Sequence, residues 1–187
     1  MAEFDNNRVY IDTNVLINWL FGVKATTAKP ATDFIKDIEN GRYKGVISFL
    51  TLNELLKVIR NLMVERGKTD PTFWERKGNE AIDKIYRIKK ENIEIVSGTT
   101  TDCEKSEDEL LFGKISDQAY TVMEKYPGGI LQKVGEKDKH DGMSTVDTFH
   151  VILAKIFNCD KIASFDGDFK EVSSEIKQLV VKEIYKV

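Results

Sequence analysis

Residues 8–21, RVYIDTNVLINWLF, are the most informative segment for predicting the fold. Its first four residues, Arg8 to Ile11, form a short apolar run that predicts a buried strand. Residues Thr13 to Phe21 carry apolar side chains at helical spacing and end just before Gly22, a residue type that commonly follows a helix. Asp12 stands at the junction. A buried strand that leads directly into a helix is typical of α/β proteins.

The same alternation continues along the chain. Further strands are predicted at 44–49, 93–96, 161–165 and 179–181, and further helices at 31–40, 51–66, 71–90, 104–126 and 144–158. Glycines and lysines between Pro127 and Gly142 predict a loop. Strands separated by helices predict a three-layer α/β sandwich, in which helices cover both faces of a central, mostly parallel sheet.

The length and composition of the chain indicate its class and its number of domains. The chain has 187 residues, 41% of them hydrophobic and 32% charged, which is typical of a globular protein. We expect a single domain over residues 1–187, with additional helices in the middle of the chain as an elaboration within 67–142. No apolar run has the length of a membrane span, and the acidic N-terminus is unlike a signal peptide. The cytoplasm is therefore the expected compartment.

Charge and cysteine content disfavour several classes of protein. The formal net charge is −3, whereas a protein that binds nucleic acid through charge alone is usually basic. Only two cysteines and two histidines occur, and Cys103 and Cys159 lie far apart in the sequence. This pattern disfavours a zinc site and requires no disulfide. A P-loop is also disfavoured, because its glycine–lysine signature does not occur.

Four carboxylates follow the predicted element boundaries. Asp12 ends the first strand, Glu54 and Asp147 lie in the first turns of two predicted helices, and Asp166 follows the strand near the C-terminus. In parallel sheets, ligands bind beyond the carboxyl ends of the strands, so all four acids are expected at one edge. Carboxylate oxygens are the ligands that Mg²⁺ and Mn²⁺ prefer.

Electrostatics favours a cation at such a cluster. Two like charges about 4 Å apart repel by roughly 4 kcal/mol at an effective dielectric constant near 20. If the acids converge, either a cation binds or some carboxylates take up protons. A metal held there would assist hydrolysis of a phosphodiester.

Each acid also has a purely structural interpretation. Thr51 with Glu54, and Ser144 with Asp147, match the spacing of a capping box. Asp12 is placed to cap the helix that begins at Thr13. Asp166 and Asp168 flank Gly167 in a turn-like sequence. His150, one helical turn after Asp147, is expected to be a packed helix residue rather than a ligand.

Four stretches together resemble the PIN-domain family: YIDTNVLINWL at 10–20, LTLNELLKVI at 50–59, VDTFHVILAK at 146–155 and IASFDGDF at 162–169. The resemblance spans nearly the whole chain, and its first and last motifs are the most specific. It implies a metal-binding and catalytic pocket of Asp12, Glu54, Asp147 and Asp166. Thr13, Asn14 and Ser164 match supporting polar residues, and Asp168 is assigned to the turn or to an indirect supporting role.

The resemblance further implies a hydrolase that uses Mg²⁺ or Mn²⁺ to cut RNA endonucleolytically, leaving a 5′-phosphate. Many relatives are VapC-type toxins that a small antitoxin silences and that form homodimers, so both partners are expected here. The stretch from Gly67 to Gly142 is longer than a compact toxin needs, which keeps an RNA-processing nuclease open. A catalytically silent module that binds RNA or a partner protein is the other alternative. A phosphatase of the haloacid dehalogenase type is disfavoured, because Asp12 lacks a second acid shortly after it.

Overall fold

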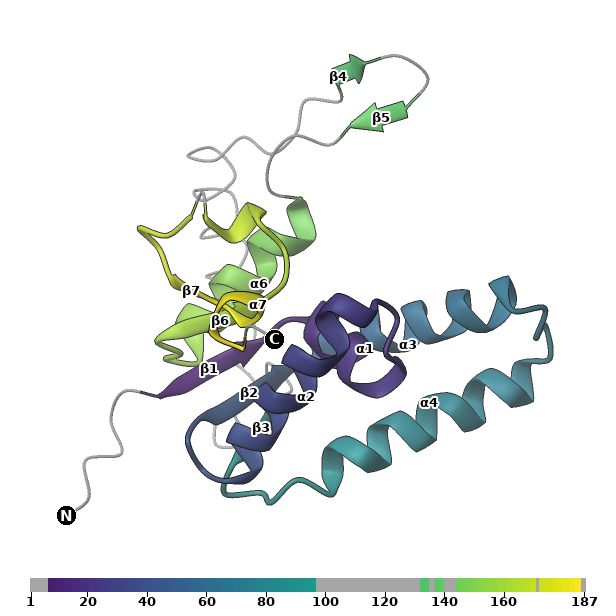
Figure 1. The fold of residues 1–187 in the computed structure, drawn as a ribbon, viewed down its shortest axis with the longest axis horizontal. Helices are drawn as coiled ribbons and strands as arrows, with labels where there is room; N and C mark the ends of the chain where they lie inside the picture. The colour runs from purple at the N-terminus through teal and green to yellow at the C-terminus, as the bar shows by residue number, and fades with distance from the viewer. Residues whose placement is uncertain (1–6, 97–131, 135–136, 140–143, 171, 186–187) are drawn as a thin grey trace, which may run out of the picture.

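The structure, a computed structural model, describes residues 7–96, 132–134, 137–139, 144–170 and 172–185. A five-stranded parallel sheet forms its centre, with the strand order β3-β2-β1-β6-β7 (Figure 1). The strands are β1 (Arg8–Ile11), β2 (Lys44–Ser48), β3 (Ile93–Val96), β6 (Lys161–Ser164) and β7 (Lys177–Val180). The prediction of a mostly parallel sheet flanked by helices is confirmed.

The helices are α1 (Thr13–Phe21), α2 (Ala25–Glu39), α3 (Phe49–Glu65), α4 (Pro71–Tyr86), α6 (Thr145–Ile156) and α7 (Val181–Ile184). A short 3₁₀ helix covers Asp168–Lys170. Helices α3 and α4 pack together as a hairpin that projects sideways from the sheet (Figure 1). Among the described residues, no helix is both long and apolar enough to cross a membrane.

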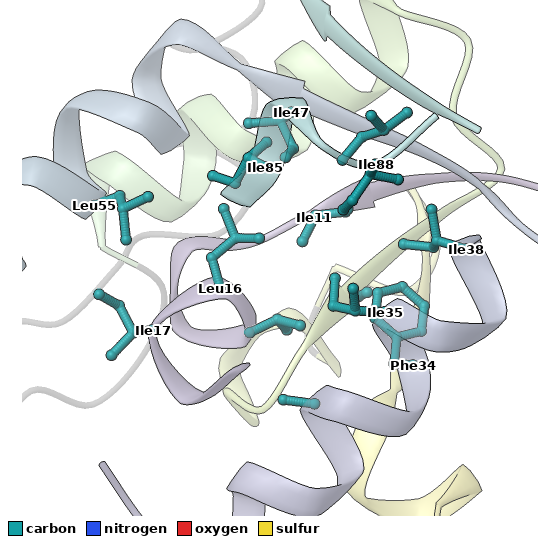
Figure 2. Close-up of a cluster of buried hydrophobic side chains, with 14 of the residues drawn as sticks. Ile11, Leu16, Ile17, Phe34, Ile35, Ile38, Ile47, Leu55, Ile85 and Ile88 are labelled. Carbon is teal, nitrogen blue, oxygen red and sulfur yellow. The ribbon is translucent and has the colours of Figure 1, made fainter. Parts of the chain in front are cut away.

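The two faces of the sheet bury different sets of side chains. In β1, Val9 and Ile11 point to the larger apolar cluster, which α1, α2, α3 and α4 cover. Figure 2 shows part of this cluster, in which Ile11 of the sheet lies near Leu16 of α1 and Ile47 lies near Ile85 of α4. Tyr10 points to the opposite face, where α6 packs. The alternation explains why the short apolar strands are buried on both sides.

The centre of the sheet is also the point where the order of strands reverses. From β1 the chain continues to β2 on one side, and β6 pairs with β1 on the other. Parallel strands end at one edge of the sheet, so the residues that follow β1, β2 and β6 come together beyond β1. Such a reversal point is where open α/β sheets usually bind their ligands.

Several element boundaries differ from those expected. Helix α2 begins at Ala25 rather than Ala31, and Pro30 lies inside it. Proline removes one helical hydrogen bond, but the hydroxyl of Thr27 donates to Asn18 Oδ1 at 2.5 Å and anchors this earlier turn. Helix α4 ends at Tyr86 rather than Lys90, because Ile88 leaves the helix to enter the core.

The segment 97–131, where a helix was expected at 104–126, lies outside the described residues. The loop expected at 127–142 is partly wrong. Its described parts, β4 (Gln132–Val134) and β5 (Lys137–Lys139), pair as an antiparallel hairpin. These strands are polar, so the apolar alternation that reveals a strand in a sequence is missing.

Gly45 in β2 should tolerate no larger side chain. A Cβ at this position would lie 2.9 Å from Ile11 Cδ1 and 3.2 Å from Ile38 Cδ1, and both isoleucines are buried. We expect Gly45→Ala to lower the free energy of unfolding by roughly 1–2 kcal/mol through overpacking. Urea denaturation measures the change.

Gly78 in α4 provides the matched control. Its added Cβ would meet Leu56 Cδ2 at 2.9 Å, but Leu56 is 43% exposed and its side chain has room to turn away. Alanine also favours a helix interior by about 1 kcal/mol over glycine. Gly78→Ala should therefore be neutral or stabilising. Equal destabilisation by the two substitutions would contradict the packing described for β2.

Candidate active site

Asp12 occupies the centre of the candidate site, directly after β1. Its side chain is only 6% exposed. It holds the N-cap position of α1, yet its carboxylate makes no capping hydrogen bond to the helix. Oδ2 instead accepts a hydrogen bond of 2.6 Å from the hydroxyl of Ser164, at the end of β6. The capping interpretation of Asp12 is therefore wrong.

Burial raises the pKa of Asp12 to about 6, because the surrounding protein disfavours the charged form. The positive field of His150 and the hydrogen bond from Ser164 act in the opposite direction. The negative charges of Asp147 and Glu54 raise the pKa further. Residues from α3 and α6 thus act electrostatically on the acid at the end of β1, as expected for side chains that face one region.

Ser164 links both sides of the site. Its hydroxyl oxygen accepts hydrogen bonds from Asn14 Nδ2 at 3.0 Å and from the backbone N–H of Asp166 at 2.9 Å, while its proton goes to Asp12. Asn14 Oδ1 accepts from the backbone N–H of Phe165 at 3.1 Å. Asn14 therefore ties the first turn of α1 to the end of β6. The structure thus places Asn14 and Ser164, two of the expected supporting residues, beside Asp12.

Glu54 reaches the site from α3. The helix begins at Phe49, two residues earlier than expected, and Ser48 caps it by accepting from the backbone N–H of Thr51. Glu54 therefore lies in the second turn rather than the first, and the Thr51–Glu54 capping box does not form. Its Oε2 accepts hydrogen bonds from the Thr13 hydroxyl at 2.8 Å and from His150 Nε2 at 2.7 Å.

Hydrogen bonds to the Glu54 carboxylate stabilise its charged form and lower its pKa. Partial burial alone would raise the pKa, but the hydrogen bonds from His150 and Thr13 and the positive field of His150 outweigh it. The net pKa lies below the ordinary value. Glu54 is therefore ionised at neutral pH, and its negative charge contributes to the environment of Asp12.

Asp147 caps a helix and also acts on the acidic site, so its structural and functional interpretations are compatible. It forms a true capping box with Ser144, because its Oδ2 accepts from the backbone N–H of Ser144 at 3.0 Å and from its hydroxyl at 2.6 Å. The residue nevertheless acts electrostatically on Asp12. Within the described part of the chain the cap engages Oδ2 alone, so Oδ1 is left for a further interaction.

Asp166 and Asp168 lie at the outer side of the site. Asp166 is exposed, and its Oδ1 accepts from the backbone N–H of Asp168 at 3.1 Å, which is the expected turn. The backbone of Asp166 joins the Ser164 network described above. Asp166 thus follows β6 at the same edge as Asp12, but with its carboxylate directed into the local turn and solvent.

The donor set has the chemistry of a site for a hard divalent cation. The hydrogen bonds described above engage a single oxygen of each acid: Oδ2 of Asp12, Oε2 of Glu54, Oδ2 of Asp147 and Oδ1 of Asp166. Within the described part of the chain, however, no three His, Cys, Asp or Glu residues lie close enough to enclose a metal ion. Mg²⁺ usually binds through one or two carboxylates and keeps several waters, so Asp12 with Glu54 or Asp147 suits it.

Sequence reasoning missed the part played by His150 and Tyr10. His150 is 1% exposed and bonds to Glu54, and its Nδ1 lies 2.8 Å from the hydroxyl of Tyr10. Periodicity correctly placed His150 on a packed helix face. What it does not reveal is the neighbour on another element, although a polar ring at an otherwise apolar position was a usable signal.

Comparison with known proteins gives one family. A family model described as the PIN domain matches residues 9–175. VapC20 of Mycobacterium tuberculosis, described as a sarcin-ricin loop cleaving toxin, has a similar structure. Its TM-score is 0.50 at 14% sequence identity, over 88% of this chain and 94% of that chain.

A second similar structure is VapBC2 from Rickettsia felis, bound to a DNA fragment from their promoter. It has a TM-score of 0.54 at 10% identity, over 91% of this chain and 96% of that chain. No curated protein matches the sequence significantly. At such low identities, the two structures show that the fold is shared.

Proposed function

Because this chain belongs to the PIN-domain family, whose members include nucleases, we propose that it is an endoribonuclease that hydrolyses RNA phosphodiester bonds with Mg²⁺ or Mn²⁺. PIN nucleases generally use divalent metals. One observation carries the assignment to this chain: Asp12 is a carboxylate only 6% exposed that directly follows the central strand β1, beyond which ligands bind in sheets of this kind. Burial raises its pKa to about 6, and the charges of Asp147 and Glu54 raise it further, so a bound cation would offset the cost of ionising it.

In this proposal Asp12 together with Glu54 or Asp147 would hold the cation, waters would complete its coordination, and Asp166 lies at the outer side. A bound divalent metal would supply positive charge against the scissile phosphate and favour activation of water. The residues of the chain orient the ligands. Ser164 fixes Asp12 by donating to its Oδ2, and Thr13 fixes Glu54 by donating to its Oε2. The capping box holds Asp147 in the same way.

The assay that tests this function incubates the purified protein with RNA in Mg²⁺, in Mn²⁺ and in EDTA. We expect cleavage with either metal, its loss in EDTA, and its return when the metal is restored. RNA binding without cleavage in any of these metals would instead favour the catalytically silent module.

The distribution of charge supports an RNA substrate. Between Lys57 and Lys90 the chain has ten lysines and arginines but five aspartates and glutamates, although the whole chain has a net charge of −3. A groove of about 390 Å³ runs between the end of α1 and the α3–α4 hairpin, and four cations line it: Arg66, Lys68, Lys77 and Lys84. Phe21 and Phe73 line it too, which provides apolar surface for bases. Glu80, the carboxylate among the described lining residues, is paired with Lys77 at 2.5 Å.

Neutralising this groove should weaken RNA binding. We expect the double variant Lys68→Gln/Lys84→Gln to bind single-stranded RNA roughly tenfold more weakly in EDTA, with a smaller dependence on salt, because fewer counterions are released. Fluorescence anisotropy of a labelled oligonucleotide measures both. The matched control is Lys161→Gln/Lys177→Gln, which removes two charges where β6 and β7 begin, at the opposite edge of the sheet. If both double variants lose affinity equally, the groove has no special role.

We further propose that the chain acts as a toxin with a small antitoxin partner and as a homodimer, in the cytoplasm, where its RNA substrate is found. The two similar structures support the toxin assignment, since one is described as a toxin and the other is a VapBC pair. An RNA-processing role remains the alternative. Expression of the chain alone distinguishes the two: a toxin arrests growth, and Asp12→Asn removes the arrest.

A further inference from the structure

A buried chain of hydrogen bonds runs from β2 to Glu54. The Tyr10 hydroxyl lies 2.5 Å from Ser48 Oγ and 2.8 Å from His150 Nδ1, and His150 Nε2 lies 2.7 Å from Glu54 Oε2. Tyr10 is fully buried and His150 is 1% exposed. These hydrogen bonds connect β2, β1 and α6 to one carboxylate oxygen of α3.

The direction of the hydrogen bond between His150 and Glu54 follows from its acceptor, the Glu54 carboxylate. An ionised carboxylate only accepts, so His150 Nε2 must donate to Glu54. The hydroxyl of Tyr10 forms a hydrogen bond with Nδ1, the other ring nitrogen of His150. The same hydroxyl also contacts the hydroxyls of Ser48 and Thr51. The edge contact of the Tyr10 and His150 rings, with centroids 5.5 Å apart, restricts the imidazole further. The imidazole N–H is thereby held in a fixed direction.

Among the described residues, the hydrogen bonds of Glu54 engage Oε2 and leave Oε1 without a partner. Oε2 already accepts from Thr13 and His150, which uses its two lone pairs. We propose that His150 is a positioning residue: its Nε2–H, oriented by Tyr10, holds Oε2 of Glu54 so that Oε1 remains available to a divalent cation. The inference rests on the proposed function, and it adds a specific determinant of cation affinity outside the acids themselves.

Residues that orient metal ligands typically change affinity by 10- to 100-fold when they are lost. The test measures Mn²⁺ affinity of the full chain, from the electron paramagnetic resonance signal of free Mn²⁺, for wild type and two variants. His150→Leu removes the donor, whereas His150→Gln places an amide N–H near the position of Nε2. We expect about tenfold weaker binding for His150→Leu and less than threefold weaker binding for His150→Gln.

Two further variants separate positioning from packing. Val151→Ala reduces a fully buried residue of the same helix and should lower the unfolding temperature without changing Mn²⁺ affinity. Tyr10→Phe keeps the ring but removes the hydroxyl, and should weaken Mn²⁺ binding severalfold. It also tests the hydrogen-bond chain if His150→Leu fails to fold.

The possible results separate a failure of the positioning role from a failure of the proposed metal site. If Glu54→Gln abolishes Mn²⁺ binding while His150→Leu and Tyr10→Phe leave it unchanged, the positioning role is wrong and the metal site stands. Equal loss in His150→Leu and His150→Gln would also overturn it, because the N–H donor would then be irrelevant. If wild type binds no Mn²⁺, or Glu54→Gln binds it normally, the proposed metal site fails and the inference fails with it.

Discussion

Asp12→Asn should reduce RNA cleavage by roughly 10³-fold or more while leaving the fold intact. A metal stabilises transition-state charge by several kcal/mol. Because each 1.4 kcal/mol is a factor of ten in rate, a loss of about 4 kcal/mol corresponds to this decrease. Asparagine retains an oxygen that accepts from Ser164, so the hydrogen bond to β6 persists. Single-turnover cleavage of a labelled RNA in Mg²⁺ measures the effect.

The matched control for this variant is Asp83→Asn. Asp83 is an exposed residue of α4, and its replacement changes the net charge by the same amount. We expect its cleavage rate to equal that of wild type within about twofold, since one exposed charge affects RNA association only weakly at physiological salt. Unchanged cleavage by Asp12→Asn would remove Asp12 from the proposed catalytic group.

The same substitution should stabilise the metal-free protein at neutral pH. The pKa of Asp12 rises from 3.8 to about 6 on folding, which corresponds to roughly 3 kcal/mol in favour of the protonated carboxyl. A group with a raised pKa stabilises the fold below its unfolded pKa and loses that contribution as the pH rises through its folded value. For Asp12 the loss falls between about pH 4 and pH 6. Asparagine resembles the protonated carboxyl group, so the Asp12→Asn variant does not undergo this loss of stability.

Chemical denaturation of wild type and Asp12→Asn across pH 4 to 8, in EDTA, measures this difference. We expect the two free energies of unfolding to be similar near pH 4, to diverge up to about pH 6, and then to differ by a constant 2–3 kcal/mol. Acids that do not interact with Asp12 are common to both proteins and cancel in the difference, and Glu54, whose pKa is lowered, stays ionised in both at neutral pH. A difference that shrinks as the pH rises would contradict the unfavourable burial of Asp12.

Mg²⁺ should first cancel the stability advantage of Asp12→Asn and then, at higher concentration, reverse it. A cation that binds the folded wild type stabilises it by mass action, by about 2.7 kcal/mol at one hundred times the dissociation constant and by about 4.1 kcal/mol at one thousand times. Asp12→Asn should gain far less. An active site that is destabilised without its cofactor is consistent with the trade-off between stability and activity seen in enzymes.

The sequence alone predicts most of what places the site. Short apolar strands, helical spacing after Asp12 and the Gly22 stop predict β1 and α1 at the bounds that the structure has. The edge rule for parallel sheets then predicts that residues after β1 and β6 meet, and Ser164 does bond to Asp12. These features depend on local pattern and on general topology, both of which a single sequence contains.

The departures arise where a contact between distant elements decides the structure. Glu54 matched a capping box by spacing, but Ser48 caps α3 and Glu54 instead bonds to His150, 96 residues away in the sequence. The position of a helix start follows from which hydroxyl reaches a free N–H, and spacing alone does not distinguish Ser48 from Thr51. Asp147 shows the converse, since its local capping box does form.

A crystal of the protein grown with Mn²⁺ gives the sharpest test of the proposed cation site, because anomalous scattering locates the metal independently of any assay. We predict a Mn²⁺ peak within coordination distance of a carboxylate oxygen of Asp12 and of Glu54 or Asp147. An absence of Mn²⁺ beside Asp12 in saturating metal, with these acids facing apart, would contradict it.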